Sequence, residues 1–270
     1  MYVFRCEDSI DGIFTAVYDA WASRLGHKNI RISCAPCEDG TLFCEYIAVG
    51  ADYEKSRKVS RTLLLRLGTH FYETICRAAM ADGSCRSLSM DKANAVYQAI
   101  VMALALPQGA GVLDHLGEPC IACIFELCRQ TSNEAHHLLE FLRFSELENG
   151  ILFSRIHPKN DVLPILAAHF TDRLPLENFI IYDAVHKTAA VHKASKSYLI
   201  ADASSIDPAL FTKYSEDEAR FRRLWCAFFD TIAVESRNNP KLQMQNIPKR
   251  FWADTVELYE KYYKSGSHLS

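Results

Sequence analysis

An Asn-Gly pair at positions 149 and 150 is the feature that most narrowly restricts the fold of this sequence. Both residues tolerate a positive φ, and an Asn-Gly step between apolar runs is the strongest short-range signal of a β-hairpin. A two-residue turn pairs the flanking residues as Leu147 with Leu152, Glu146 with Phe153, and Phe144 with Arg155. The last pair predicts a cation–π contact across the strands. We therefore expect an antiparallel sheet in the C-terminal half.

Further strands and helices are predicted along the same half. Asn160 or Asp161 caps a short helix that carries Pro164 in its first turn. Ser215 and Glu218 form a capping box that opens a helix to about position 235. The predicted core stripe of that helix is Phe221, Leu224, Trp225, Phe228 and Ile232. The predicted strands are FIIYD, TAAVH and SYLIAD, and a last short helix begins near Asp254.

The N-terminal half is predicted to be mainly helical. Ser9 or Asp11 caps its first helix, and Asp52 caps the second. The predicted helices are 11–24, 52–67, 68–81, 89–105 and 119–143. Residues 1–5 predict a strand, and IRISC and TLFCEYIAV predict a short strand pair around the turn PCEDG.

The Gly- and Pro-rich segment PQGAGVLDHLGEP is the best candidate for a boundary or hinge. It separates a mainly helical region, 1–110, from an α+β region, 119–270, with one continuous domain as the alternative. The expected fold class is α+β, in which the helical N-terminal half packs on a C-terminal antiparallel sheet with flanking helices.

Composition narrows the class of protein. The chain has 270 residues, 49% of them apolar, and a formal charge of -3, so no overall basic balance points to nucleic acid. The N-terminus MYVFRCEDSIDG is acidic before any apolar run, which is unlike a secretory signal. The run AIVMALALP is too short to cross a bilayer. We expect a cytoplasmic protein that does not bind membranes.

The ten cysteines include CxxC pairs at Cys34/Cys37 and Cys120/Cys123. Together these pairs could supply the thiolate ligands of a structural zinc site. However, more than eighty residues separate them, and the second pair lies in the apolar helical segment PCIACIFELC. We interpret these cysteines as buried structural thiols and keep zinc as the alternative.

The helix before the hairpin raises a question of metal chemistry. Glu134 and His137 form a Glu-x-x-His pair, one half of a di-iron carboxylate site, but the sequence has no second such pair. At helical spacing His136, Glu140 and Arg143 instead share one polar stripe. This stripe is typical of a pocket wall or a surface network.

A second polar group follows the hairpin, and its imidazoles and carboxylates could bind Zn or Fe or transfer protons. Its members are His157, Asp161, His169, Asp172 and Arg173. His157 and His169 are weak metal candidates, and Asp161 competes as a helix cap. The nucleophile elbow, the P-loop and the H-E-x-x-H motif are all missing from the sequence.

The stretch NNPKLQMQNIPKRFW combines cations with aromatic side chains. Lys241, Lys249 and Arg250 lie beside Phe251 and Trp252, and cations with adjacent aromatic faces suit contact with single-stranded or flipped nucleotides. The alternative is a surface loop whose aromatic side chains anchor it to the core.

Residues 134–192, the N-terminal YVFRCEDSIDGIFTAVYDAW and the ending NPKLQMQNIPKRFW resemble a bacterial domain family of unknown function. Members of that family are described as proteins of DNA metabolism or DNA repair. The positions that match the family pattern are His136, 141–144, Glu148, Pro158, Asp161, Phe170, Arg173, Asp183, 239–240, Pro248, Arg250 and Trp252. The chain departs from it at Phe179, where Trp is common, at Tyr182, where His is common, and at His186 and Lys187, where arginines are expected.

The resemblance implies a radical SAM protein of the DNA-repair type as partner. Similar domains elsewhere are fused to a uracil-DNA-glycosylase-like domain, for which we expect no room among these 270 residues, and the sequence lacks the radical SAM cluster motif. We expect no cofactor, and the resemblance carries over no catalytic residue.

The leading hypothesis is an accessory protein of DNA metabolism that binds DNA or a repair enzyme. The candidate binding residues are His136, Arg143, Arg155, Asp161, Arg173, Asp183, Arg250 and Trp252. The rival hypothesis is a metal-dependent or acid/base enzyme that uses His136, His157, Asp161 and His169. A structural scaffold for the partner is the third.

Overall fold

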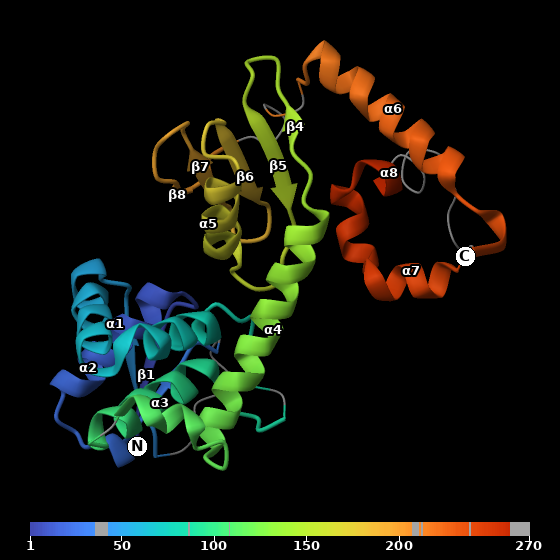
Figure 1. Cartoon of the computed structure of the whole chain (residues 1–270). Helices are drawn as coiled ribbons and strands as arrows, with labels where there is room; N and C mark the ends of the chain where they lie inside the picture. Colours follow the sequence, from blue (N-terminus) through green and yellow to red (C-terminus); the bar gives the residue numbers. More distant parts are fainter. Residues whose placement is uncertain are drawn as a thin grey trace. The chain divides into compact units, whose positions relative to one another are not determined.

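This computed structural model divides into two units, Met1–Asn133 and Glu134–Ser270 (Figure 1). The sheet of the first unit consists of parallel strands. The structure describes residues 1–35, 43–85, 87–107, 109–206, 211, 213–237 and 239–259. Helices and sheets occur together, so the predicted α+β class is confirmed.

In the first unit, β1 (Tyr2–Cys6) lies between β2 (Ile30–Ser33) and β3 (Glu45–Val49) and is parallel to both. Helix α1 (Ile10–Ala22) is the crossover from β1 to β2. The prediction of a strand pair around PCEDG was therefore wrong, since β2 and β3 each pair with β1 and not with each other. The turn itself lies outside the described residues.

Helices α2 (Tyr53–Ala79), α3 (Lys92–Ala105) and α4 (Pro119–Phe141) follow. α2 joins the predicted helices 52–67 and 68–81, and the predicted break survives as a kink at Gly68, whose φ of 83° suits glycine. The predicted cap at Asp52 is confirmed, because its Oδ1 accepts from the N–H of Glu54 at 2.9 Å. Ser9 rather than Asp11 caps α1 by accepting from the N–H of Gly12.

The core of the first unit is formed by large side chains of the helices together with the sheet. Its largest fully buried members include Phe14, Phe71, Tyr97, Ile100 and Ile121. Cys120 and Cys123 are 3% and 0% exposed, and burial raises the pKa of both thiols, as expected of structural cysteines. Cys37 lies outside the described residues.

The sheet of the second unit has the order β4-β5-β6-β7-β8. Its strands are β4 (Ser145–Glu146), β5 (Leu152–Ile156), β6 (Phe179–Asp183), β7 (Thr188–His192) and β8 (Leu199–Asp202). A fully antiparallel sheet was predicted, but β5 and β6 are parallel. The reason is α5 (Leu163–Arg173), which carries the chain back along the sheet as a crossover.

The hairpin exists, but its predicted register was wrong by one residue. Glu146 pairs with Leu152 and Ser145 with Phe153. Gly150 has a φ of 76°, and its N–H donates to the carbonyl of Leu147 at 2.8 Å. The connection is therefore a three-residue loop closed by a left-handed glycine rather than a two-residue turn.

This register removes the predicted contact between Phe144 and Arg155. Phe144 packs edge-to-face on Phe170, with ring centroids 5.1 Å apart, and also contacts Phe179 at 5.5 Å. Both partners belong to the buried core of the second unit. The guanidinium of Arg155 is directed to Asp254 instead.

The C-terminal elements are α6 (Glu216–Ile232), α7 (Pro240–Asn246), a 3-10 turn over Lys249–Asp254 and α8 (Val256–Tyr259). The capping box is confirmed, since Ser215 Oγ accepts from the N–H of Glu218 at 3.1 Å. The predicted core stripe of α6 was wrong: its residues Phe221, Leu224, Trp225, Phe228 and Ile232 are 65%, 55%, 42%, 53% and 56% exposed.

None of the helices in the described part of the chain is long and apolar enough to cross a membrane.

Candidate functional site

A pocket of about 420 Å³ opens in the second unit, where the hairpin strands meet α6, the 3-10 turn and α8. Its wall includes Ser145, Ser154 and Thr255, whose hydroxyls can donate or accept hydrogen bonds. Charged and aromatic side chains complete the wall, and the sequence places them on segments far apart. The strand pairing of β4 with β5, the bridge between Leu147 and Tyr214, and the hydrogen bond from the N–H of Ser215 to the carbonyl of Glu146 at 3.0 Å bring these segments together.

Arg143, Arg155 and Arg222 line this pocket, which we call the arginine pocket. Arg143 donates through Nη1 to the carbonyls of Glu140 and Leu142 at the end of α4. Arg222 donates through Nε to Glu218 at 3.0 Å and through Nη2 to Ser145 Oγ at 2.8 Å. Each guanidinium carries five N–H donors, so these contacts leave donors for a ligand.

Aromatic rings form the apolar part of the arginine pocket. The rings of Phe153 and Phe211 stack with centroids 4.4 Å apart and planes 8° apart. The guanidinium of Arg222 lies 4.2 Å from the centroid of Tyr214. This cation–π contact holds the arginine side chain flat against the wall, so its charge is positioned before any ligand binds.

Asp254 is the carboxylate in the wall of the pocket, and it already has cationic or proton-donating partners. Its side chain is 7% exposed and lies 2.9 Å from His157 Nδ1 and 3.8 Å from Arg155 Nε. The carboxylate is therefore compensated locally. Glu218 likewise pairs with Arg222 at 3.0 Å, so the three guanidiniums stand against two carboxylates. The remaining positive charge favours an anionic ligand.

The predicted site residues do not all converge. Arg143 and Arg155 lie in the arginine pocket, whereas His136 is on the surface and pairs with Glu140 at 3.1 Å. Arg173 is exposed in the last turn of α5. Arg250 pairs with Glu134 at 2.9 Å.

Trp252 cannot act as an open stacking platform in this structure. It is 3% exposed, and its Nε1 donates to the carbonyl of Ile247 at 2.8 Å. The neighbouring Phe251 is 1% exposed and belongs to the core of the second unit. These aromatic side chains anchor the stretch to the core, which was the alternative interpretation of this sequence.

Glu134, the carboxylate of the Glu-x-x-His pair, is 2% exposed, and both of its oxygens accept hydrogen bonds. It accepts hydrogen bonds from the backbone N–H groups of Lys159 and Asn160 at 3.0 and 2.7 Å. It also accepts from the side-chain amide of Asn160 and pairs with Arg250. Glu134 therefore fixes the loop after β5 and the 3-10 turn at once, which is a structural role and not half of a di-iron site.

A separate cluster lies at the carboxyl ends of the parallel strands β5 and β6. Donor atoms of Asp161, Asp183 and His186 all lie within 4.8 Å of one another. Asp183 is fully buried, and its Oδ1 accepts from the backbone N–H groups of Val185 and His186. Its Oδ2 lies 2.6 Å from His186 Nδ1. Carboxylates with one imidazole form a donor set that suits Mn, Fe or Zn.

Asn160 and Asp161 were the predicted caps of α5, and both predictions were wrong. The N-cap is Val162, and no side-chain oxygen caps the helix. Asp161 is thereby left beside Asp183. His157 lies against Asp254 instead, and His169 is exposed with its ring edge-to-face to Phe170 at 5.2 Å.

Sequence reasoning missed Arg222, Tyr214, Phe211 and Asp254 as members of the arginine pocket. The capping box gave the start of α6, and Arg222 follows Glu218 at the i+4 position of an ion pair. That spacing could have predicted that Glu218 holds the Arg222 side chain in place. Nothing local in the sequence pairs it with Arg143 and Arg155.

Comparison with known proteins gives a family match. A family model described as a domain of unknown function, DUF4130, matches residues 90–257, which is more than half of the chain. The match covers the residues of the arginine pocket up to Val256. No curated protein matches the chain.

Proposed function

The chain belongs to the DUF4130 family, and from the chemistry of its arginine pocket we propose that it is an accessory protein of DNA metabolism that binds single-stranded nucleic acid. The observation that carries the proposal is the convergence of Arg143, Arg155 and Arg222 in one pocket. Guanidinium groups bind phosphate oxygens in a bidentate geometry that other side chains do not match.

The aromatic part of the pocket supports a nucleotide rather than a simple anion. Bases stack on aromatic faces, and such stacking contributes about 1–3 kcal/mol per base in single-strand-binding proteins. The partly exposed rings of Phe211 and Tyr214 line the pocket beside the guanidiniums, and Phe211 stacks on the buried Phe153. The hydroxyls of Ser145, Ser154 and Thr255 add donors and acceptors suited to sugar and base edges.

The test measures binding of the full chain to a fluorescein-labelled single-stranded oligonucleotide by anisotropy over a range of salt concentrations. We expect the logarithm of the binding constant to fall linearly with the logarithm of salt, by about 0.7 per phosphate contacted. Arg155→Ala should weaken binding several-fold and make this slope shallower by about one contact. Uracil-containing strands serve as a parallel ligand.

The matched control is Arg173→Ala, which removes the same charge from an exposed position on α5 outside the arginine pocket. It should leave the affinity and the slope unchanged. An equal loss in both variants would mean diffuse electrostatic attraction and would refute the pocket as the site. Lack of binding at low salt, alone and with the partner enzyme, would refute the function.

The protein partner in this proposal is a radical SAM enzyme of the DNA-repair type, which the sequence resemblance supports. Copurification of the two full chains tests it. Two results together would favour a scaffold instead. The complex would form with Arg143→Ala and with Arg155→Ala, and even the unaltered protein would not bind the oligonucleotide.

A metal-dependent enzyme is the second candidate, and the cluster of Asp161, Asp183 and His186 favours it. A divalent ion held by these donors would keep coordination positions for water, as catalytic metal sites do. Elemental analysis of protein purified without chelator should then find one Zn, Mn or Fe per chain. The metal should be lost in His186→Ala and kept in His169→Ala; metal well below one per chain would refute this candidate.

A further inference from the structure

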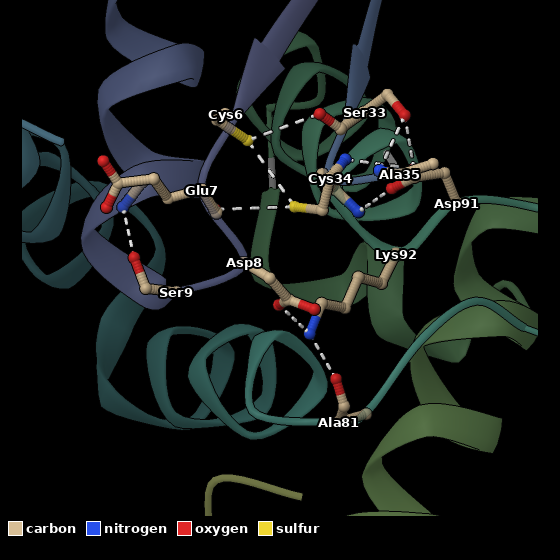
Figure 2. Close-up of polar contacts among 12 residues, drawn as sticks. Cys6, Glu7, Asp8, Ser9, Ser33, Cys34, Ala35, Ala81, Asp91 and Lys92 are labelled. Carbon is tan, nitrogen blue, oxygen red and sulfur yellow. Dashed lines mark hydrogen bonds and ion pairs between the residues drawn. The ribbon is translucent and has the colours of Figure 1, made fainter. Parts of the chain in front are cut away.

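Two thiols of the first unit lie side by side at the carboxyl ends of neighbouring strands. Cys6 is the last residue of β1, and Cys34 follows the last residue of β2. The parallel register pairs Arg5 with Ser33, so the next residue on each strand is a cysteine. Their sulfur atoms are 3.5 Å apart, and Figure 2 shows the side chains pointing toward one another.

This arrangement is close to that of a disulfide. Neighbouring strands lie about 4.8 Å apart, within the range of roughly 4.4–6.8 Å between the Cα atoms of bridged cysteines. A disulfide needs a sulfur–sulfur distance of about 2.05 Å, so the sulfurs of Cys6 and Cys34 must approach by about 1.5 Å. Rotation of the side chains can supply that movement without a change of strand register.

The thiols are also reachable. Cys6 and Cys34 are both partly exposed, whereas Cys76, Cys85, Cys120 and Cys123 are buried. A small oxidant in solvent can therefore reach the first pair more readily than the core cysteines. The buried thiols serve as an internal comparison, since they differ in access and not in chemistry.

Each sulfur also contacts a backbone carbonyl, and Cys6 Sγ donates to the carbonyl of Ser33 at 3.8 Å (Figure 2). Cys34 Sγ donates to the carbonyl of Glu7 at 3.7 Å and lies beside the sulfur of Cys6 (Figure 2). The hydrogen bond to Cys6, together with burial, raises the pKa of the Cys34 thiol well above its usual range. A thiol with a raised pKa is a weaker first nucleophile, so the reaction below assigns the first attack to Cys6 and the second to Cys34.

We propose that Cys6 and Cys34 are a modification site, a redox-active dithiol that closes to a reversible disulfide when the oxidant is a hydroperoxide. The Cys6 thiolate attacks the peroxide oxygen, which gives a sulfenic acid and releases hydroxide. The Cys34 sulfur then displaces the sulfenic hydroxyl, and the thiol proton leaves with it as water. In sum, two thiols and one hydrogen peroxide give one disulfide and two waters, and an external dithiol reverses the reaction.

The disulfide would join the end of β1 to the end of β2 beside the start of α3. The N–H of Cys34 donates to Asp91 Oδ2 at 3.1 Å, and Asp91 Oδ1 caps α3 through the N–H of Ala93. Ser33 Oγ donates to the same carboxylate at 2.7 Å. Oxidation would thus fasten the ends of both strands beside the start of α3, and it should raise the melting temperature of the first unit.

The experiment treats the reduced full chain with a small excess of hydrogen peroxide, blocks free thiols with iodoacetamide, digests with trypsin and identifies linked peptides by mass spectrometry. Cys6 falls in residues 6–24, and Cys34 shares residues 32–55 with Cys37 and Cys44. Fragment ions should place the link between Cys6 and Cys34. Dithiothreitol should restore both thiols.

Variants keep the test decisive. The link should persist in Cys37→Ser and Cys44→Ser and disappear in Cys6→Ser, and a rise of several degrees in melting temperature should follow oxidation only where the link forms. Free, alkylated Cys6 and Cys34 after oxidation would overturn the proposal. So would a link from either residue to Cys37 or Cys44, or linkage of the buried cysteines at an equal rate.

Discussion

Glu134 offers the sharpest test of how the second unit is held together, because glutamine has the same shape without the same bonding capacity. Each carboxylate oxygen of Glu134 faces more than one donor. Oε1 faces the N–H of Lys159 and Nη1 of Arg250, and Oε2 faces the backbone and side-chain N–H groups of Asn160. Whichever oxygen becomes an NH₂ group, Glu134→Gln sets donor against donor.

The magnitude follows from burial. Removing one partner of a buried, hydrogen-bonded charge pair costs about 3–5 kcal/mol. Arg250 is 34% exposed, so water recovers part of that loss, and we expect the low end, about 3 kcal/mol. In a unit of this size the melting temperature should then fall by about 10 °C. Glu134→Ala should behave similarly, since the same donors lose their acceptor.

The assay is urea and thermal unfolding of the full chain, followed by tryptophan fluorescence. Trp252 reports on this region because it is buried in the same 3-10 turn as Arg250. The control is His136→Ala on the same helix, where an exposed pair with Glu140 should contribute less than about 0.5 kcal/mol. If Glu134→Gln unfolds within that margin of the unaltered protein, the donors are satisfied by water and the argument fails.

Further outcomes are expected elsewhere in the fold. Lys92 is 3% exposed and pairs with Asp8. Asp8→Asn removes the partner of this buried charge and should lower the free energy of unfolding by about 2–3 kcal/mol. Adding Lys92→Met should restore most of that loss, and a double-mutant cycle in urea measures both effects. Burial raises the pKa of Tyr97 to about 12. The unfolded chain then loses this proton first, near pH 10, and stability should fall by up to about 3 kcal/mol as the pH rises from 10 to 12; an unchanged alkaline limb in Tyr97→Phe would contradict this. Gly150→Ala places a side chain at a φ of 76° and should cost about 1 kcal/mol, whereas Gly150→Asn should cost less, as denaturation midpoints would show.

The hairpin shows what sequence reasoning could and could not provide. Asn149 and Gly150 fixed the position of the turn because few residues tolerate a positive φ. The register depended on whether the loop has two or three residues, and the apolar side chains on both flanks of the turn fit either pairing. The pairing of Glu146 with Leu152 and the hydrogen bond from Leu147 to the carbonyl of Ile151 distinguish the two.

Long-range packing accounts for the other differences. The spacing of Phe221, Trp225 and Phe228 correctly predicted an amphipathic helix, but amphipathicity states which face is apolar and not what covers it. The parallel pairing of β5 with β6 likewise depends on where α5 returns the chain. The caps at Asp52 and Ser215 were predicted correctly because their bonds span only a few residues. The predicted cap of α5 was wrong because the side chain of Asn160 bonds to Glu134 instead.

The candidate residues of the C-terminal stretch, Arg250 and Trp252, have structural contacts of their own. Arg250 is held by Glu134, and Phe251 and Trp252 are buried, so the turn over Lys249–Asp254 is fixed along its length. The residue that this turn delivers to the arginine pocket is Asp254, which contacts His157 and approaches Arg155. A change at Arg250 should therefore lower stability together with binding and leave the salt dependence per phosphate intact. Loss of affinity at Arg250 with unchanged stability would instead place that side chain on the ligand.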